Sequence, residues 1–297
     1  MGFRHLVLTF LVAFILCGCS IAVDPVSTNT DEDDTTNQNK EENDTGNVVT
    51  EFINQFFEEP VEEVEELEVK EPRELHYLAL GDSLTDGVGD EYLKDGYVGR
   101  IADTLDEWPS IELVSIDNRG KRGRRSDQLL KLLEKGHYDE ELKSAEMISM
   151  TIGGNDVMKV VKADLFNLKR KAFKKEQSAY EKRYIKIVEE IRKKNPTAPL
   201  LLIGFYNPFS IVTNEVNEFD SIIHDWNKVI KDIASEDSNA CYVTVEDLFE
   251  SNDELVYHTD FFHPNGKGYE QMANRIVQTI ELCGMEQQIN KEIGFEE

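Results

Sequence analysis

Cysteine, tryptophan and basic residues are all scarce in this chain. Four cysteines and two tryptophans occur among 297 residues, and 32 lysines and arginines stand against 59 aspartates and glutamates. So few cysteines exclude a small domain built on a dense disulfide framework. The formal net charge of −27 argues against a nucleic-acid partner, because binding to a phosphate backbone needs a basic surface.

Sequence signals of the common ligand sites are missing as well. The chain has no glycine-rich phosphate loop of the G-x-x-x-x-G-K type. His258, Asp260 and His263 could suggest metal ligands, but no thiolate or further histidine motif accompanies them. The sequence therefore predicts neither a metal ion nor another cofactor.

The first 18 residues have the composition of a signal peptide. Arg4 gives a positive start, and the apolar stretch over residues 6–16 is shorter than the about 20 residues of a membrane span. The stretch ends in L-C-G-C, which resembles a bacterial lipobox and implies that cleavage leaves a lipid-modified Cys19. We expect this lipid to hold the protein on the extracytoplasmic face of the cell membrane. The alternative is an ordinary signal peptide or an uncleaved anchor.

Residues 19–74 are predicted to form an acidic flexible tether. Residues 24–74 include 18 acidic and three basic residues, and thus carry 15 of the 27 net negative charges. The first half has almost no apolar side chains, so it cannot bury enough surface to offset the entropy lost on folding. The second half contains four apolar residues at helical spacing, which predict a short helix that packs on the domain, frays in solvent or binds a partner: Phe52, Ile53, Phe56 and Phe57.

Only Cys241 and Cys283 would remain free after processing. An exported protein can form disulfides, but the sequence does not show whether these two residues lie close together. We expect no disulfide scaffold and leave this one pairing open.

From residue 75 onward, apolar runs alternate with amphipathic stretches. The runs are continuously apolar, which is typical of parallel strands covered on both faces. Helical patterns with apolar residues three and four apart are clearest over residues 180–191 and 269–280. The pattern predicts one α/β domain over residues 75–284 and a polar C-terminal tail over residues 285–297. The predicted strands cover residues 76–80, 111–116, 147–152, 200–205 and 242–245.

Polar motifs follow these strands where each one ends. Ser83 follows the first strand, Gly123 lies just beyond the second, and Asn155 follows the third. The segment 260–264 follows the fifth strand after a longer loop. Because ligand sites in parallel sheets lie beyond the carboxyl ends of the strands, we expect these motifs to converge at one edge.

A serine, a histidine and an acid at one edge can turn a weak hydroxyl into a nucleophile. Ser83 alone could merely cap a helix, and His263 before Pro264 could merely begin one. Asp260 lies three residues before His263, where its carboxylate can hold the imidazole in one tautomer and orientation.

Four motifs follow one another along the chain: G-D-S-L from Gly81, N-x-G-x-x-G from Asn118, G-G-N-D from Gly153 and D-F-F-H-P from Asp260. In this order they resemble the motifs of the SGNH hydrolases, also called GDSL esterases or lipases. The resemblance covers residues 75–282. It implies a three-layer αβα sandwich with a five-stranded parallel sheet, a flavodoxin-like fold with strand order 2-1-3-4-5. The chain does not match the G-x-S-x-G elbow of α/β-hydrolases, because Thr85 stands where that motif needs glycine.

The resemblance also implies the role of each site residue. Ser83 is the expected nucleophile, His263 the general base and Asp260 the acid that orients it. The expected oxyanion hole consists of the backbone N–H groups of Ser83 and Gly123 and the side-chain amide of Asn155. Three neighbours are expected to shape the loops instead of taking part in the chemistry: Gly120, Asp82 and Asp156.

A basic cluster surrounds Gly123 in this acidic chain, formed by Arg119, Lys121, Arg122, Arg124 and Arg125. One explanation is a solvated loop whose charges pair with nearby carboxylates. The other is recognition of an anionic substrate by Arg122, Arg124 and Arg125, such as a phospholipid headgroup or a cell-wall polymer. The planar guanidinium suits phosphate and carboxylate because it makes two hydrogen bonds with them.

The primary interpretation is a lipid-anchored, monomeric serine esterase that hydrolyses acyl or acetyl esters through an acyl-serine intermediate. A lipase or lysophospholipase and a carbohydrate O-acetyl esterase acting on cell-wall polymer differ in a pocket that the sequence does not show. A ligand-binding surface lipoprotein without catalysis is the alternative of another class. Such a protein would not need Ser83, Asn155, Asp260 and His263 all intact.

Overall fold

The computed structural model describes residues 71–164, 168–210, 217–250 and 255–290. The predicted signal peptide, Cys19, the apolar residues 52–57 and residues 291–297 lie outside these ranges. Within them, no helix has both the length and the apolar character needed to cross a membrane.

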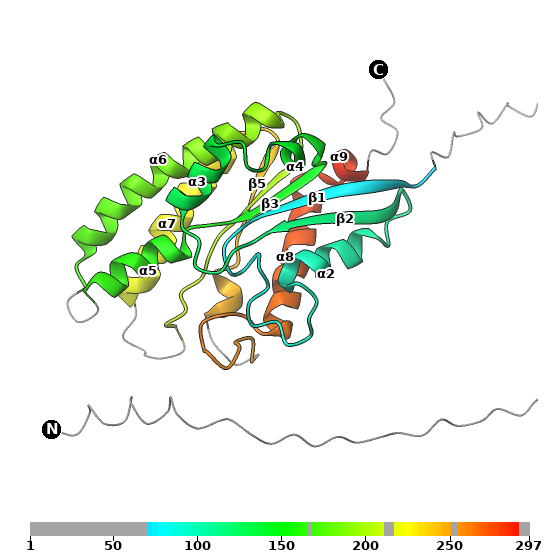
Figure 1. Ribbon diagram of the computed structural model, residues 1–297. Coiled ribbons are helices and arrows are strands. Elements are labelled where there is room, and N and C mark those ends of the chain that lie inside the picture. Colours follow the sequence, from blue (N-terminus) through cyan, green and yellow to red (C-terminus); the bar gives the residue numbers. More distant parts are fainter. Residues whose placement is uncertain (1–70, 165–167, 211–216, 251–254, 291–297) are drawn as a thin grey trace, which may run out of the picture. The chain divides into compact units, whose positions relative to one another are not determined.

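The domain is built on one parallel sheet. Its strands follow the order β2-β1-β3-β4-β5, with every neighbouring pair parallel (Figure 1). The predicted α/β class and the strand order 2-1-3-4-5 are therefore confirmed. The strands are β1 (Arg73–Gly81), β2 (Ile111–Arg119), β3 (Met147–Thr151), β4 (Leu200–Ile203) and β5 (Ala240–Val243).

Helices cover both faces of the sheet. Helices α3 to α7 lie on one face, with α6 in contact with α3, α4, α5 and α7, and α2 packs against α8 on the other (Figure 1). The helices are α2 (Gly96–Leu105), α3 (Ser126–Glu134), α4 (Asp139–Ser144), α5 (Gly154–Ala163), α6 (Arg170–Lys194), α7 (Asn217–Ser235), the 3₁₀-helix η2 (Asp247–Phe249), α8 (Gly266–Leu282) and α9 (Glu286–Asn290).

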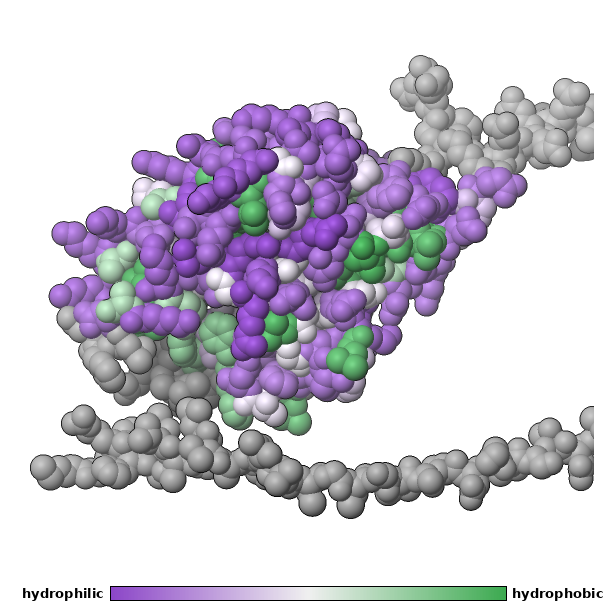
Figure 2. Space-filling model, in the orientation of Figure 1, coloured by the Kyte–Doolittle hydropathy of each residue, from purple (hydrophilic) through white to green (hydrophobic). Residues whose placement is uncertain are grey.

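Alternate residues of β1, β3 and β4 pack into two separate cores. Leu78 and Leu80 of β1 pack into the core that contains Tyr180 of α6. Tyr77 and Ala79 pack into the core that contains Tyr269 of α8. Burial on both faces explains why these strands are continuous apolar runs in the sequence. On the face shown in Figure 2, the described surface is mainly hydrophilic, with small separate hydrophobic patches.

The packed domain extends past the predicted boundary at residue 284. Met285 and Ile289 are buried, and the Ile289 carbonyl accepts a hydrogen bond of 2.5 Å from Arg73. The prediction of a polar tail from residue 285 is therefore wrong up to Asn290, because Met285, just before α9, and Ile289 of α9 pack into the second core. A disulfide between Cys241 and Cys283, with Cα atoms 6.4 Å apart, joins β5 to the end of α8. It supplies the pairing that the sequence left open.

Candidate active site

Ser83 lies in a tight turn directly after β1. The Asp82 carboxylate accepts hydrogen bonds from the Leu84 N–H and the Thr151 hydroxyl, both of 3.1 Å, and so holds the turn against β3. Gly81 has a φ of +156°, and a Cβ there would lie 2.5 Å from the Thr151 carbonyl oxygen. Glycine is therefore required where the chain leaves the strand. The expected loop-shaping role of Asp82 agrees with these contacts.

The structure brings Ser83, His263 and Asp260 together although the first two are 180 residues apart. His263 Nε2 lies 3.0 Å from Ser83 Oγ, and His263 Nδ1 lies 2.6 Å from Asp260 Oδ2. The other oxygen of Asp260 accepts the backbone N–H groups of Phe262 and His263, at 3.0 and 2.9 Å. Tyr206 donates to the Phe262 carbonyl at 2.7 Å and fixes the loop from the β4 side. The arrangement is that of a nucleophile, a base and an orienting carboxylate.

The environment of Asp260 keeps its carboxyl group ionised. Partial burial by itself would raise its pKa, but the hydrogen bonds from His263 and from the two backbone N–H groups outweigh this effect. The pKa of Asp260 therefore lies below its ordinary value. An ionised Asp260 can stabilise the imidazolium that forms when His263 accepts the serine proton.

Gly123, in the loop before α3, and Asn155, in the first turn of α5, approach the site from two segments that are bonded to each other. Gly123 has a φ of +77°, and no atom lies within 4 Å of the position that a Cβ would occupy. The Asn155 amide donates one hydrogen bond of 3.1 Å to the Arg124 carbonyl, directly after Gly123. An amide nitrogen carries two hydrogens, so the second remains for a substrate oxygen. A Cβ on Gly120, in contrast, would lie 2.6 Å from Thr85, which fits the expected role in the turn.

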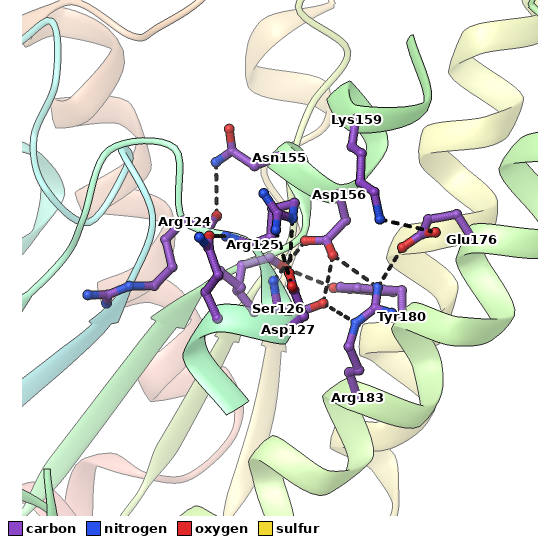
Figure 3. A network of polar contacts seen from close by, with 12 residues as sticks. Arg124, Arg125, Ser126, Asp127, Asn155, Asp156, Lys159, Glu176, Tyr180 and Arg183 are labelled. Atoms are coloured by element: carbon purple, nitrogen blue, oxygen red, sulfur yellow. Dashed lines mark hydrogen bonds and ion pairs between the residues drawn. The ribbon is translucent and has the colours of Figure 1, made fainter. Parts of the chain in front are cut away.

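A second pair of contacts joins the same two segments, between the first residue of α3 and the first turn of α5 (Figure 3). The buried Asp156 carboxylate accepts the Ser126 N–H at 2.9 Å and the Ser126 hydroxyl at 2.7 Å. Burial raises the pKa of Asp156, although the bonds from Ser126 and Arg183 oppose the shift. As expected from the sequence, Asp156 holds loop backbone.

The basic cluster is largely engaged by the protein itself. Arg124 donates to the carbonyls of Gly81 and Arg119, at 3.1 and 2.5 Å. Arg125 makes two hydrogen bonds with Asp127, at 3.0 and 3.1 Å, and Arg119 pairs with two carboxylates. The structure therefore does not support the assignment of Arg124 and Arg125 to an anionic substrate. Arg122 is exposed, and its backbone N–H donates to Asp86.

An apolar pocket opens beside Ser83 and Asn155. Counted together with the solvent space at its mouth, its empty volume is about 490 Å³. No sequence pattern marks its lining, because these side chains have the same spacing and composition as ordinary core residues. Among the lining residues are Met158 and Val157 of α5, Phe205 after β4, Phe219 and Ile223 of α7, and Phe262 beside His263. In the described part of the chain, no three His, Cys, Asp or Glu side chains converge to form a possible metal site.

Residues 79–271, about two thirds of the chain, match the model of the GDSL-like Lipase/Acylhydrolase family. The chain belongs to this family. It is 38% identical over 220 residues to the uncharacterized protein YpmR of Bacillus subtilis, covering 73% of this chain and 86% of YpmR. It is 29% identical over 209 residues to the spore germination lipase LipC of Bacillus licheniformis, covering 68% and 94% of the two chains.

Solved structures agree with this membership. The lipase Lip_vut3 from a goat rumen metagenome superposes with a TM-score of 0.62 and 27% identity, covering 69% of this chain and 97% of its own. The acetylxylan esterase Axe2 of Geobacillus stearothermophilus shares the fold at a TM-score of 0.51 and 20% identity, covering 71% and 95%. The GDSL-family protein is thus a carboxylic ester hydrolase with the SGNH hydrolase fold.

Proposed function

We propose that this GDSL-family hydrolase cleaves esters of apolar acyl chains through an acyl-Ser83 intermediate. The observation that carries the proposal is the chain of contacts from Asp260 through His263 to Ser83 at the mouth of an apolar pocket. A lipase-type substrate accounts for that pocket better than an acetyl group does, because an acetyl group has only one methyl to bury.

The proposed reaction has two halves. Ser83 Oγ attacks the ester carbonyl while His263 Nε2 accepts the serine proton, and His263 then returns this proton to the departing alcohol. In the second half, a water molecule takes the place of the alcohol and His263 again acts as the base. The negative charge that develops on the carbonyl oxygen in each half is stabilised by the N–H groups of Ser83, Gly123 and Asn155.

The nucleophile is tested with two matched serine variants. Ser83→Ala should abolish hydrolysis of p-nitrophenyl esters and labelling by a fluorophosphonate, with the unfolding midpoint largely unchanged. Ser144→Ala, at an exposed serine of α4, should retain both properties. Substantial turnover by Ser83→Ala, or labelling of another serine, would contradict the assignment.

The acyl class is tested with a series of p-nitrophenyl esters from acetate to decanoate. Burial of each methylene contributes about 0.8 kcal/mol, so kcat/KM should rise about fourfold per methylene until the pocket is full. A maximum at acetate would instead favour an O-acetyl esterase.

We further propose that Cys19 carries a lipid and that the acidic residues 19–74 hold the domain away from the extracytoplasmic face of the membrane. The support is the apolar stretch over residues 6–16, followed by L-C-G-C. In bacterial cells, the wild-type protein should incorporate labelled fatty acid, Cys19→Ala should not, and Cys17→Ala should behave as the wild type. A soluble wild-type protein with an unmodified mature terminus would overturn this proposal.

A further inference from the structure

Helix α6 contacts both loops of the oxyanion hole with two residues one turn apart. Tyr180 donates to the Ile152 carbonyl at 2.9 Å, and its ring fills the space behind Gly153. Arg183 reaches Ser126 and Asp156 in the network of Figure 3. None of these contacts involves Ser83 or His263, so α6 supports the oxyanion side of the site separately from the nucleophile and base.

Arg183 is the centre of this support. Its Nε donates to Ser126 Oγ at 2.7 Å, and its Nη2 lies 3.0 Å from Asp156 Oδ1 and 2.8 Å from Glu176 Oε1. Asp156 in turn holds the N–H and the hydroxyl of Ser126. Arg183, Asp156 and Ser126 therefore form a closed triangle of contacts, which we call the Asp156 clamp.

The clamp lies directly beside the two donors that come from separate segments, Gly123 in the loop before α3 and Asn155 in the first turn of α5. Ser126 is three residues after Gly123, and Asp156 is the neighbour of Asn155. The bond between Asn155 and the Arg124 carbonyl fixes the spacing of the segments at one point, and the Asp156 clamp fixes it at a second. Two points of attachment fix the orientation of the Gly123 segment relative to the Asn155 segment, whereas a single point would let one segment rotate about it.

We infer that Arg183 is a positioning residue for ester hydrolysis, which holds the Gly123 N–H and the Asn155 amide at the spacing that the oxyanion requires. The inference rests on the proposed oxyanion hole. Arg183 supplies a cation to a carboxylate that is only 1% exposed. Without that cation the buried Asp156 charge loses its counter-ion, and the carboxylate holds Ser126 less firmly. Because Arg183 does not line the pocket, its loss should affect the transition state and leave substrate binding unchanged.

The test compares two arginines of the same helix. Arg192 lies nine positions later, about 14 Å along the axis. Like Arg183 it is mostly covered, with side chains 20% and 16% exposed respectively, and it bonds a carboxylate, Asp237, together with three backbone carbonyls. Arg183→Met and Arg192→Met should both lower the unfolding midpoint, but only Arg183→Met touches the oxyanion loops.

On p-nitrophenyl butyrate, Arg183→Met should lower kcat about 10- to 100-fold with KM within about twofold, since misplacing a catalytic group by about 1 Å costs about 100-fold. Arg192→Met should keep kcat within about twofold. Arg183→Lys keeps the positive charge that Arg183→Met removes, so it should have a higher kcat than Arg183→Met. A role of Arg183 in packing alone would not predict this difference. Ser126→Ala removes the hydroxyl from the triangle and should lower kcat severalfold, so it decides the matter if Arg183→Met does not fold.

Equal kcat values for Arg183→Met and Arg192→Met would overturn the inference, as would an Arg183→Met defect confined to KM. An unchanged kcat in Ser126→Ala would contradict it as well. These outcomes differ from failure of the proposed function, which would appear as activity in Ser83→Ala or as an inactive wild-type protein.

Discussion

Replacing Asp82 with asparagine should stabilise the fold above pH 7. Asp82 is 4% exposed, and burial raises its pKa from 3.8 to about 7, although hydrogen bonds from Leu84 and Thr151 oppose the shift. Asparagine has nearly the same shape, and its oxygen can accept the same two hydrogen bonds. The substitution therefore removes the buried ionisable group and keeps the turn.

The sign and size of this stability change follow from proton binding to Asp82 in the folded and unfolded states. Between pH 4 and pH 7 the unfolded chain has released the Asp82 proton while the folded chain retains it, so the free energy of unfolding falls as pH rises. The shift from 3.8 to about 7 is about three pH units. At 1.36 kcal/mol per unit it corresponds to about 4 kcal/mol, an upper value that water entry or loop relaxation reduces. The free energy of unfolding of Asp82→Asn should therefore exceed that of the wild type by about 1–4 kcal/mol at pH 8, and by less at pH 5.

Asp90 provides a control of opposite sign. It is also buried, but its carboxylate makes hydrogen bonds of 2.5 and 3.0 Å with Arg100. Burial alone would raise the pKa of Asp90, yet the bonds from Arg100 and from backbone N–H groups lower it. Its contribution to stability is thus present above pH 4 and is lost at lower pH. Asp90→Asn should destabilise the fold by about 3–5 kcal/mol at pH 8, because Arg100 loses its buried partner.

Urea unfolding of the three proteins at pH 5 and pH 8 measures these differences. Comparison of each variant with the wild type at the same pH cancels the titration of all other groups. A lower stability of Asp82→Asn than of the wild type at pH 8, or a stability advantage that does not grow between pH 5 and pH 8, would contradict a raised pKa of Asp82.

Four further substitutions probe the site and the scaffold. Asn155→Ala should lower kcat about 10²- to 10³-fold with little change in KM, and a rise in KM with kcat unchanged would argue for a role in ground-state binding. Ile223→Trp should fill the pocket and move the optimum of the ester series to shorter acyl chains, whereas an unchanged optimum would place the acyl chain elsewhere. Arg124→Ala should reduce activity on neutral and anionic esters alike, since its side chain holds the carbonyls at the ends of β1 and β2; a selective loss on anionic esters would support a role in substrate recognition. Cys241→Ser should cost about 4 kcal/mol, worked from the 42-residue separation of the disulfide, and an unchanged urea midpoint would show that the bond does not stabilise the fold.

Helix α6 shows both what the sequence predicts and what it does not predict. Tyr180, Tyr184, Ile187 and Ile191 repeat at helical spacing, and all four are fully buried as that spacing predicts. Arg183 lies between them in a segment rich in lysine and glutamate, where nothing distinguishes it from a solvated residue. Its partners Ser126 and Asp156 are 57 and 27 residues away, so no local pattern could reveal the contact.

The arginines near Gly123 show the same limit. Their number and position pointed to an anionic ligand or to pairing with carboxylates, and charge alone does not separate the two. In the folded chain, Arg119 and Arg125 pair with carboxylates, whereas Arg124 donates to a backbone carbonyl at the end of β1, 43 residues earlier in the sequence. Similarly, the apolar residues of the pocket differ from core residues only in that no side chain fills the space between them.

The sequence by itself determined the features that depend on local pattern. These are the parallel sheet, the strand ends at which polar motifs occur, and the motifs that mark Ser83, His263 and Asp260 as candidates for the nucleophile, the base and the acid. Each follows from spacing or from a short motif, because strand burial and turn geometry act over a few residues. The tertiary structure alone decided the acyl pocket, the disulfide, the engagement of the arginines and the Asp156 clamp. These depend on which distant segments meet, and packing in three dimensions sets that neighbourhood by burying both faces of the sheet at once.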